Sequence, residues 1–336
     1  MPTSAPTLET HPRTTADRVI RAGFRVLNYT TPALGARVAE ELFFTPPRPR
    51  RSPRIERFLA TGRRFDVRAG SRRVSAWSWG RGPRVYLVHG WGGRGGQLGA
   101  FVEPLVAHGL SVVAFDAPGH GTSEGRRTSL LEFYEALRVL VDTLGAGHGV
   151  VAHSLGAPAT ALALQRGVAL GRAVFVAAPA DPADWTRRFA SRFRIAPRLL
   201  AAMQAQSERR LGFRWEDLKV TTLARDLATP LLIVHDEEDA DVPWSDGALI
   251  ADAWSGARLL TTRGLGHRQI LRDPGVVEAV TAFLLGGPLG KPESAAAQPV
   301  EAGVPGTASS PSASAELERY LFQRDSRRER RAVLDR

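Results

Sequence analysis

The sequence predicts an α/β fold, with a mostly parallel sheet and helices on both of its faces. Between Arg84 and Leu285, short apolar runs that suit strands alternate with longer segments that suit helices. This alternation is typical of parallel sheets whose strands are connected by helices. The chain has 336 residues, of which 43% are hydrophobic, and folds of this kind often fill about 200 to 250 residues as one unit. We therefore expect one core domain, residues 64–287, with an extension at each end.

The extension before the core domain, residues 1–63, is expected to be helical and rich in arginine. Apolar residues recur at helical spacing from Ala16 to Phe44, with a break at Pro32. Such a stripe either docks on a core or lies on a membrane surface. Docking is favoured, because the helices are short and no lipidation motif is present. Residues 64–79 then suit two antiparallel strands at the edge of the sheet.

The extension after the core domain, residues 288–336, is expected to be a disordered linker followed by a charged tail. Up to Ser314 it is rich in Pro, Ala, Ser and Gly and holds few large apolar side chains. Such a composition cannot bury enough apolar surface to fold.

A tight turn between a strand and a helix is predicted at Ser154. The apolar run Val150–His153 precedes this serine, and an Ala-rich segment follows it. The backbone of such a turn is strained, so small residues are needed two positions before and two after the serine. The sequence has Ala152 and Gly156 there. The turn would expose the hydroxyl and aim the N–H groups of the helix at a nearby oxyanion, although a serine can also simply cap a helix.

An acid and a histidine follow the serine farther along the chain. Pro230–His235 is an apolar run that suits a buried strand, and the acidic segment Asp236–Pro243 comes directly after it. Gly264–His267 then places an imidazole on a glycine-rich loop. Serine, acid and histidine in this chain order are one of the arrangements that activate a serine nucleophile.

A glycine-rich turn, His89–Gly93, follows the strand predicted at Arg84–Val88. Glycines leave backbone N–H groups unshielded, so the amides of Trp91 and Leu155 are candidates for an oxyanion hole. Such turns also bind phosphates, but the residues that complete a P-loop or a dinucleotide fingerprint are missing.

Five motifs in this order make the chain resemble the α/β-hydrolase superfamily, in its serine esterase, lipase and thioesterase branch. They are His89–Gly93, Phe115–Ser123, His153–Gly156, Asp239–Pro243 and Gly266–His267. The resemblance implies an α/β-hydrolase sheet in which Ser154 is the nucleophile, His267 is its general base and Asp239 orients the histidine. A serine nucleophile argues against the dehalogenase and epoxide-hydrolase branches, which use an aspartate.

The chain departs from the pattern of the family at two places. Ala152 and Ala157 replace commoner glycines around Ser154, which is a sterically mild change. Asp236 stands where the family usually has glycine, and this crowds several carboxylates together.

Other acids and histidines near the motifs are given lesser roles. The neighbours of Asp239 are expected to be solvated loop charges: Asp236, Glu237, Glu238 and Asp241. Some family members place the acid after the sixth strand, where this chain has Asp181 and Asp184. The remaining histidines of the motifs are expected to form hydrogen bonds at strand ends, and none has metal-ligand spacing: His89, His120, His153 and His235. We expect neither a metal nor a cofactor.

The segment of about residues 180–220 is expected to form a helical cap over the serine. Its Trp185 and Phe189, together with Trp91, are candidates to line a substrate pocket. The same aromatic side chains could instead pack helices against one another.

The positive charge is concentrated before the catalytic motifs. Residues 1–85 hold 17 Arg and 6 acidic residues, which accounts for the whole net charge of +11. The densest part, residues 47–54, could contact an anionic surface, but a solvated arginine-rich surface is favoured. No nucleic-acid partner is expected.

Cysteine usage and apolar runs limit the cellular setting. The chain has no cysteine, which excludes disulfides and thiol catalysis. It has neither a run long enough to span a membrane nor a signal-peptide pattern at its start. We expect a cytoplasmic location.

These observations predict a serine hydrolase. It would cleave a carboxylic ester or thioester of a small to medium hydrophobic acyl group through an acyl-enzyme on Ser154. Its partner would be a small-molecule acyl substrate, and the oligomeric state is not predicted. The alternatives are an acyltransferase with the same three residues and a non-catalytic binding protein that keeps the fold.

Overall fold

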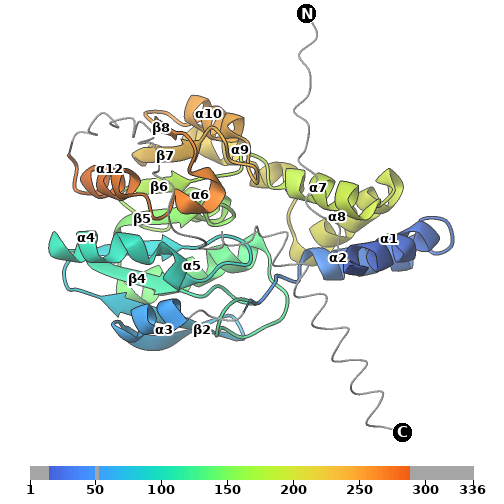
Figure 1. Ribbon diagram of the computed structural model, residues 1–336, viewed down its shortest axis with the longest axis horizontal. Coiled ribbons are helices and arrows are strands. Elements are labelled where there is room, and N and C mark those ends of the chain that lie inside the picture. The colour runs from blue at the N-terminus through green and yellow to red at the C-terminus, as the bar shows by residue number, and fades with distance from the viewer. Residues whose placement is uncertain (1–14, 50–52, 288–336) are drawn as a thin grey trace, which may run out of the picture.

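The computed structural model describes residues 15–49 and 53–287, which form an eight-stranded sheet flanked by helices (Figure 1). The strands are β1 (Arg63–Ala69), β2 (Arg72–Trp79), β3 (Arg84–Val88), β4 (Ser111–Phe115), β5 (Gly147–His153), β6 (Ala173–Val176), β7 (Leu231–Asp236) and β8 (Arg258–Thr262). The α-helices are α1 (Thr15–Leu27), α2 (Pro32–Phe43), α3 (Pro53–Ala60), α4 (Val102–Ala107), α5 (Leu130–Leu144), α6 (Gly156–Gln165), α7 (Ala183–Phe193), α8 (Pro197–Leu211), α9 (Val220–Leu223), α10 (Trp244–Ala253), α11 (Gly266–Gln269) and α12 (Pro274–Leu284). Short 3-10 helices occur at η1 (Gly95–Phe101), η2 (Trp215–Leu218) and η3 (Ala224–Asp226). The linker and tail expected over residues 288–336 lie outside the described residues.

The strands follow the order β1-β2-β4-β3-β5-β6-β7-β8 across the sheet. β2 runs antiparallel to both of its neighbours, β1 and β4, and every other pair is parallel. The predicted fold class, including the two antiparallel strands near its edge, is therefore confirmed. Because β3 to β8 are parallel, their carboxyl ends meet at one edge of the sheet, where such folds build their sites.

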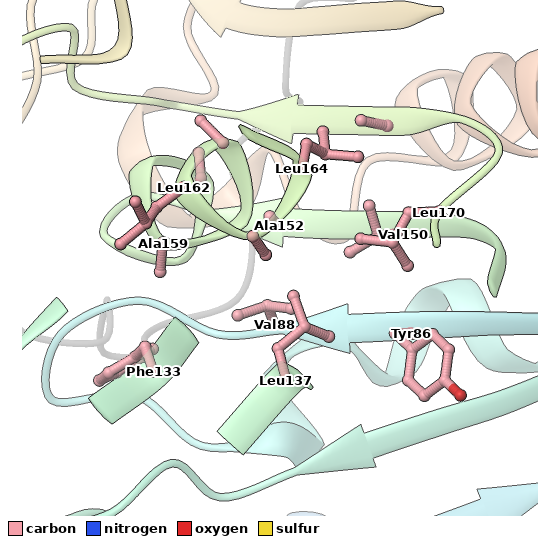
Figure 2. Close-up of a cluster of buried hydrophobic side chains, with 14 of the residues drawn as sticks. Tyr86, Val88, Phe133, Leu137, Val150, Ala152, Ala159, Leu162, Leu164 and Leu170 are labelled. Atoms are coloured by element: carbon pink, nitrogen blue, oxygen red, sulfur yellow. The ribbon is translucent and has the colours of Figure 1, made fainter. Parts of the chain in front are cut away.

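The central strands are apolar along their whole length because helices cover both faces of the sheet. Residues of β3 alternate between the two faces: Tyr86 and Val88 join one buried cluster, and Val85 and Leu87 join the other. The first cluster packs against α5, α6, α9 and α10, and the second against α3, α4 and α12. Figure 2 shows part of the first cluster, in which Val88, Ala152 and Leu137 lie between strands and helices.

A group of four helices, α1, α2, α7 and α8, projects from one side of the sheet (Figure 1). We call it the helical unit. α7 and α8 come from the segment expected to be the cap, and α1 and α2 come from the segment before the core domain. Their shared apolar interior includes Phe24, Ala39, Phe193, Leu199 and Met203. The helices near the start of the chain therefore dock on α7 and α8, the helices of the segment expected to be the cap.

The chain between α2 and α3 lies against the core domain. Pro47 is buried, and the guanidinium of Arg48 donates to the carbonyl oxygens of Gly119 at 2.6 Å and Ser123 at 2.9 Å. The described part of the arginine-rich segment 47–54 thus uses one of its charges inside the molecule; residues 50–52 lie outside the described residues. None of the described helices is long and apolar enough to span a lipid bilayer.

Candidate active site

Ser154 sits between β5 and α6 with a backbone φ of +50°, a conformation that non-glycine residues rarely adopt. Its amide donates to the carbonyl of Val176 on the neighbouring strand, at 3.0 Å, and its carbonyl accepts from the amide of Ala157, at 2.9 Å. These two bonds hold the turn between strand and helix. The local geometry is that of the strained elbow expected from the sequence.

The small residues around Ser154 are required by the packing of the elbow against the end of β3. A Cβ on Gly156 would lie 2.6 Å from the carbonyl oxygen of Val88. A Cβ on Gly90 would lie 2.8 Å from the Cβ of Ser154. Both separations are too short for real atoms, so glycine at both positions allows the glycine-rich turn and the serine to lie against each other.

His267 and Asp239 are hydrogen-bonded to each other. Nδ1 of His267 donates to Oδ2 of Asp239 at 2.7 Å, which leaves Nε2 as the ring nitrogen able to accept a proton. The other oxygen of Asp239 accepts from the amides of Asp241 and Val242, both at 2.8 Å. The carboxylate is thus fixed by its own loop and presents one oxygen to the imidazole.

Asp236 corrects an expectation, because it is not a solvated loop charge. It is the last residue of β7 and is fully buried. Its carboxylate accepts hydrogen bonds from Oγ1 of Thr262 at 2.7 Å and from the amides of Leu265 and Glu238, both at 3.0 Å. Burial raises the pKa of this carboxyl, but the hydrogen bonds lower it, and the net pKa lies below its ordinary value.

The other candidate acids point elsewhere. Glu237 and Glu238 are exposed, as expected, and Glu237 pairs with Arg263. Asp181 and Asp184 both pair with the guanidinium of Arg187. Asp239 is the acid whose carboxylate accepts the hydrogen bond from Nδ1 of His267.

Four further histidines surround the turns of the site, and burial lowers the pKa of each. The pKa of His89 falls to about 4, although a hydrogen bond to the carbonyl of Gly90 raises it, and the pKa values of His120 and His153 fall well below the ordinary value. The pKa of His235 is also lowered. The ring of His89 donates from Nδ1 to that carbonyl at 2.7 Å and accepts from the amide of Ala117 on Nε2 at 2.9 Å, which fixes a neutral tautomer.

Two of these histidines brace the site by hydrogen bonds, as the sequence predicted. Nε2 of His153 donates to the carbonyl oxygen of His267 at 2.9 Å. Nε2 of His120 accepts from the amide of Gly92 at 3.0 Å. Among the described residues, no group of three or more His, Cys, Asp or Glu side chains is placed to hold a metal ion.

The two amides expected to form the oxyanion hole lie on the turns next to Ser154. Leu155 follows the serine directly, and Trp91 follows Gly90, the residue that packs on the Cβ of Ser154. Within the described residues, neither amide takes part in a hydrogen bond. Both donors are therefore available to an incoming oxygen.

The aromatic residues proposed for the pocket have different surroundings. Trp185 is half-buried on α7, with the guanidinium of Arg188 5.5 Å from its ring centre. Phe189 contacts the rings of Phe43 and Phe193, at 5.4 and 5.0 Å, so it packs helices against one another. The indole of Trp91 lies against the ring of His120, at 5.7 Å.

Sequence reasoning missed a hydrogen bond between α7 and the loop that carries Asp239. Arg188 on α7 donates from its guanidinium to the carbonyl oxygen of Asp241, two residues after Asp239. No sequence signal identifies this partner, because an arginine can reach any carbonyl that the fold brings near.

A cavity of about 980 Å³ lies at the opposite edge of the sheet, where β3 and β4 begin. Trp79, Arg81 and Arg84 are among the residues that line it, and none of Ser154, Asp239 and His267 does. This cavity is therefore separate from the candidate active site.

Known proteins share both the sequence pattern and the fold. Residues 85–280, more than half of the chain, match the alpha/beta hydrolase family. Pimeloyl-[acyl-carrier protein] methyl ester esterase from Methylococcus capsulatus is 50% identical over 44 residues, which cover 13% of this chain and only 17% of that relative.

Solved structures with the same fold are more distant in sequence. A bromoperoxidase from Bacillus anthracis aligns with a TM-score of 0.54 and 18% identity, over 67% of this chain and 100% of its own. Est1E from Butyrivibrio proteoclasticus, solved with ferulic acid bound, aligns with a TM-score of 0.50 and 18% identity, over 66% of this chain and 98% of its own. At such identities the likeness concerns the fold alone. The sheet order, the elbow and the match over residues 85–280 together establish that the chain belongs to the α/β-hydrolase family.

Proposed function

We propose that this hydrolase cleaves a carboxylic ester or thioester through an acyl-enzyme on Ser154. The observation that carries the proposal is the hydrogen bond between His267 and Asp239 at the sheet edge that also presents the strained Ser154. The esterase among its relatives supports the same reaction class. Ordinary serine is a weak nucleophile, and a neighbouring imidazole held in the right tautomer is the usual means of activating it.

In the first half-reaction, Nε2 of His267 takes the proton of the Ser154 hydroxyl as Oγ attacks the substrate carbonyl. The carbonyl oxygen becomes an oxyanion, which the amides of Trp91 and Leu155 stabilise; such a donor lowers the barrier by about 3 kcal/mol. Asp239 stabilises the imidazolium. The imidazolium then returns the proton to the leaving alcohol or thiol, and an acyl-enzyme remains.

In the second half-reaction, water takes the place of the leaving group. His267 removes a proton from the water as its oxygen attacks the acyl carbon, and the proton passes to Oγ of Ser154 when the acid is released. The half-buried Trp185 on α7 and Trp91 on the glycine-rich turn favour a small to medium hydrophobic acyl group. A non-water acceptor at this step would make the protein an acyltransferase.

The experiment that tests the proposal combines a panel of p-nitrophenyl esters, from acetyl to long-chain, with a fluorophosphonate probe. We expect wild-type protein to prefer short or medium chains and to react with the probe. Ser154→Ala should lose about three orders of magnitude or more in kcat and all labelling. Ser191→Ala, at an exposed serine on α7, is the matched control and should behave as wild type. Equal turnover by wild type and Ser154→Ala would refute the proposal.

A further inference from the structure

The outward face of α1 is apolar even though the opposite face of the helix is already packed on the cap. Phe24 is buried in the helical unit. On the other side, Val19 and Val26 are 60% and 58% exposed, and Tyr29, just after the helix, is 82% exposed. Residues 19 and 26 are seven apart and so share one face. Single exposed apolar residues need no explanation, but a row of them does.

Unpaired positive charge lies on α1 and on the adjoining helix α2. Arg18 and Arg25 of α1 and Arg37 of α2 are exposed. Within residues 15–49 and 53–287, none of these three side chains forms an ion pair. They belong to the part of the chain, residues 1–85, that carries the whole net charge of +11. The face therefore combines aliphatic side chains, an exposed tyrosine and uncompensated arginines.

We propose that this outer face of α1 docks on an anionic phospholipid surface. A helix with apolar residues on one side and flanking arginines lies in the plane of the headgroups, with its apolar side chains in the acyl boundary. Each basic residue near such a surface contributes about a fivefold change in affinity. A single convex helix face offers little area for a specific protein interface, which buries about 800 Å² on each partner. This docking does not depend on the chemistry at Ser154.

The test is flotation of the full-length protein with vesicles of phosphatidylcholine alone and of phosphatidylcholine mixed with phosphatidylglycerol. Wild type should bind the mixed vesicles and lose binding as salt rises. Val19→Ser/Val26→Ser and Arg18→Gln/Arg25→Gln should each bind about 10-fold or more weakly. Leu249→Ser, at a residue of α10 that is 53% exposed, is the control and should bind as wild type.

Three results would overturn this proposal. The first is equal binding of wild type to neutral and mixed vesicles, and the second is unchanged binding by both α1 variants. The third is a dimer in lipid-free sedimentation velocity that Val19→Ser/Val26→Ser dissociates, because the face would then belong to a second copy. The substituted residues are exposed, so circular dichroism should show that the variants are folded.

A second inference comes from the contacts of Asp236 and rests on the proposed function. The carboxylate accepts from the amide of Leu265, two residues before His267, and from the amide of Glu238, one residue before Asp239. It also accepts from Oγ1 of Thr262, where β8 ends. One buried group thus holds both loops that carry the hydrogen-bonded acid and base. We infer that Asp236 is a positioning residue, which fixes the distance between Asp239 and His267.

Asp236→Asn tests this role, because it keeps the size of the side chain but turns an acceptor oxygen into an N–H donor that faces backbone N–H groups. We expect kcat on a p-nitrophenyl ester to fall about 10- to 100-fold while KM stays the same. The low-field proton resonance of the His267–Asp239 hydrogen bond should broaden or vanish. Glu237→Gln, at the adjacent exposed acid, should leave both unchanged.

The two possible failures are distinguishable. If Asp236→Asn still shows the resonance and has the same kcat as the control Glu237→Gln, then Asp236 does not position the pair. If wild type shows the resonance but neither turns over esters nor reacts with the fluorophosphonate probe, then the proposed function fails, and the resonance alone still reports on the positioning.

Discussion

The sheet and the helical unit are held together by different kinds of contact. The sheet is joined by backbone ladders between apolar strands, and residues such as Val85 and Val174 are fully buried in it. The helical unit is joined through side chains, both by its shared apolar interior and by polar contacts between its helices. For example, the side-chain amide of Asn28, on the α1–α2 turn, donates to the backbone carbonyl of Arg194 and accepts from the backbone N–H of Ala196. The candidate catalytic residues lie on the part whose shape backbone bonds fix, whereas the position of the cap depends on side chains that one substitution can remove.

Acid should weaken the sheet edge first, and this is the largest effect we expect. The pKa of His89 is about 4 in the folded protein and about 6.5 when exposed. A depressed pKa means that the unfolded state binds more protons between these values, so stability is fully present above pH 6.5 and is lost as pH falls toward 4. His89 alone accounts for about 3 kcal/mol, and the other buried histidines add to it.

Urea unfolding at pH 7 and pH 5, combined with hydrogen exchange, measures this effect. The helices of the helical unit contain no histidine, so their exchange should accelerate less than that of β5. An unfolding free energy that does not change from pH 7 to pH 5 would contradict the burial of neutral histidines.

The polar contacts of the helical unit can be broken at Glu40. Its carboxylate is 2% exposed and meets the side chains of Arg210, Gln206 and Arg127, which belong to α8 and to the loop before α5. Glu40→Gln leaves arginine charge uncompensated, and we expect a loss of about 2 kcal/mol, because Arg210 keeps partial access to water.

Glu41→Gln is the matched control for this variant. Glu41 also pairs with Arg127, but it is 59% exposed, so its loss should cost less than about 0.5 kcal/mol. Equal costs for the two variants, measured by chemical denaturation, would show that burial does not matter at this contact.

The close packing around the turn at Ser154 predicts that one methyl group added at Gly156 lowers the activity. Gly156→Ala would place its Cβ 2.6 Å from the carbonyl of Val88 and 2.8 Å from that of His89. Because backbone cannot swing aside as a side chain can, we expect about 1–3 kcal/mol of destabilisation and about a 100-fold lower kcat/KM through displacement of Ser154. Wild-type activity in this variant would show that the elbow is not rigid.

The same substitution in α1 should have the smallest effect, and of opposite sign. A Cβ on Gly23 meets nothing within 4 Å. Alanine favours helices over glycine by about 1 kcal/mol, so Gly23→Ala should stabilise the protein by up to about that amount. A lower melting temperature for Gly23→Ala would mean that this face of α1 is covered.

The sheet and the elbow could be predicted because their signals are local. Apolar runs such as Val150–His153 are typical of buried strands, and small residues around Ser154 are required by steric crowding within a few residues. The sequence order of acid and histidine also restricted the candidates. The sequence predicts the same role, a solvated loop charge, for Asp236 and Glu237. Only the structure separates them, because burial depends on the whole fold.

The docking partner of the first helices could not be predicted for a similar reason. A stripe that includes Phe24 says only that one face is covered, and its actual partners, such as Leu199 and Met203, lie far along the chain. Likewise, the rings around Phe189 separate helix packing from pocket lining only in three dimensions.

The bond from Asn28 to Arg194 spans 166 residues of sequence, and this has a consequence on the ribosome. At about 5–20 residues per second, α1 and α2 emerge roughly 8 to 30 s before the helices that will cover Phe24 and Ala39. During that interval the apolar faces of α1 and α2 lack the helices that cover them in the folded protein, so the nascent chain exposes a binding site for chaperones.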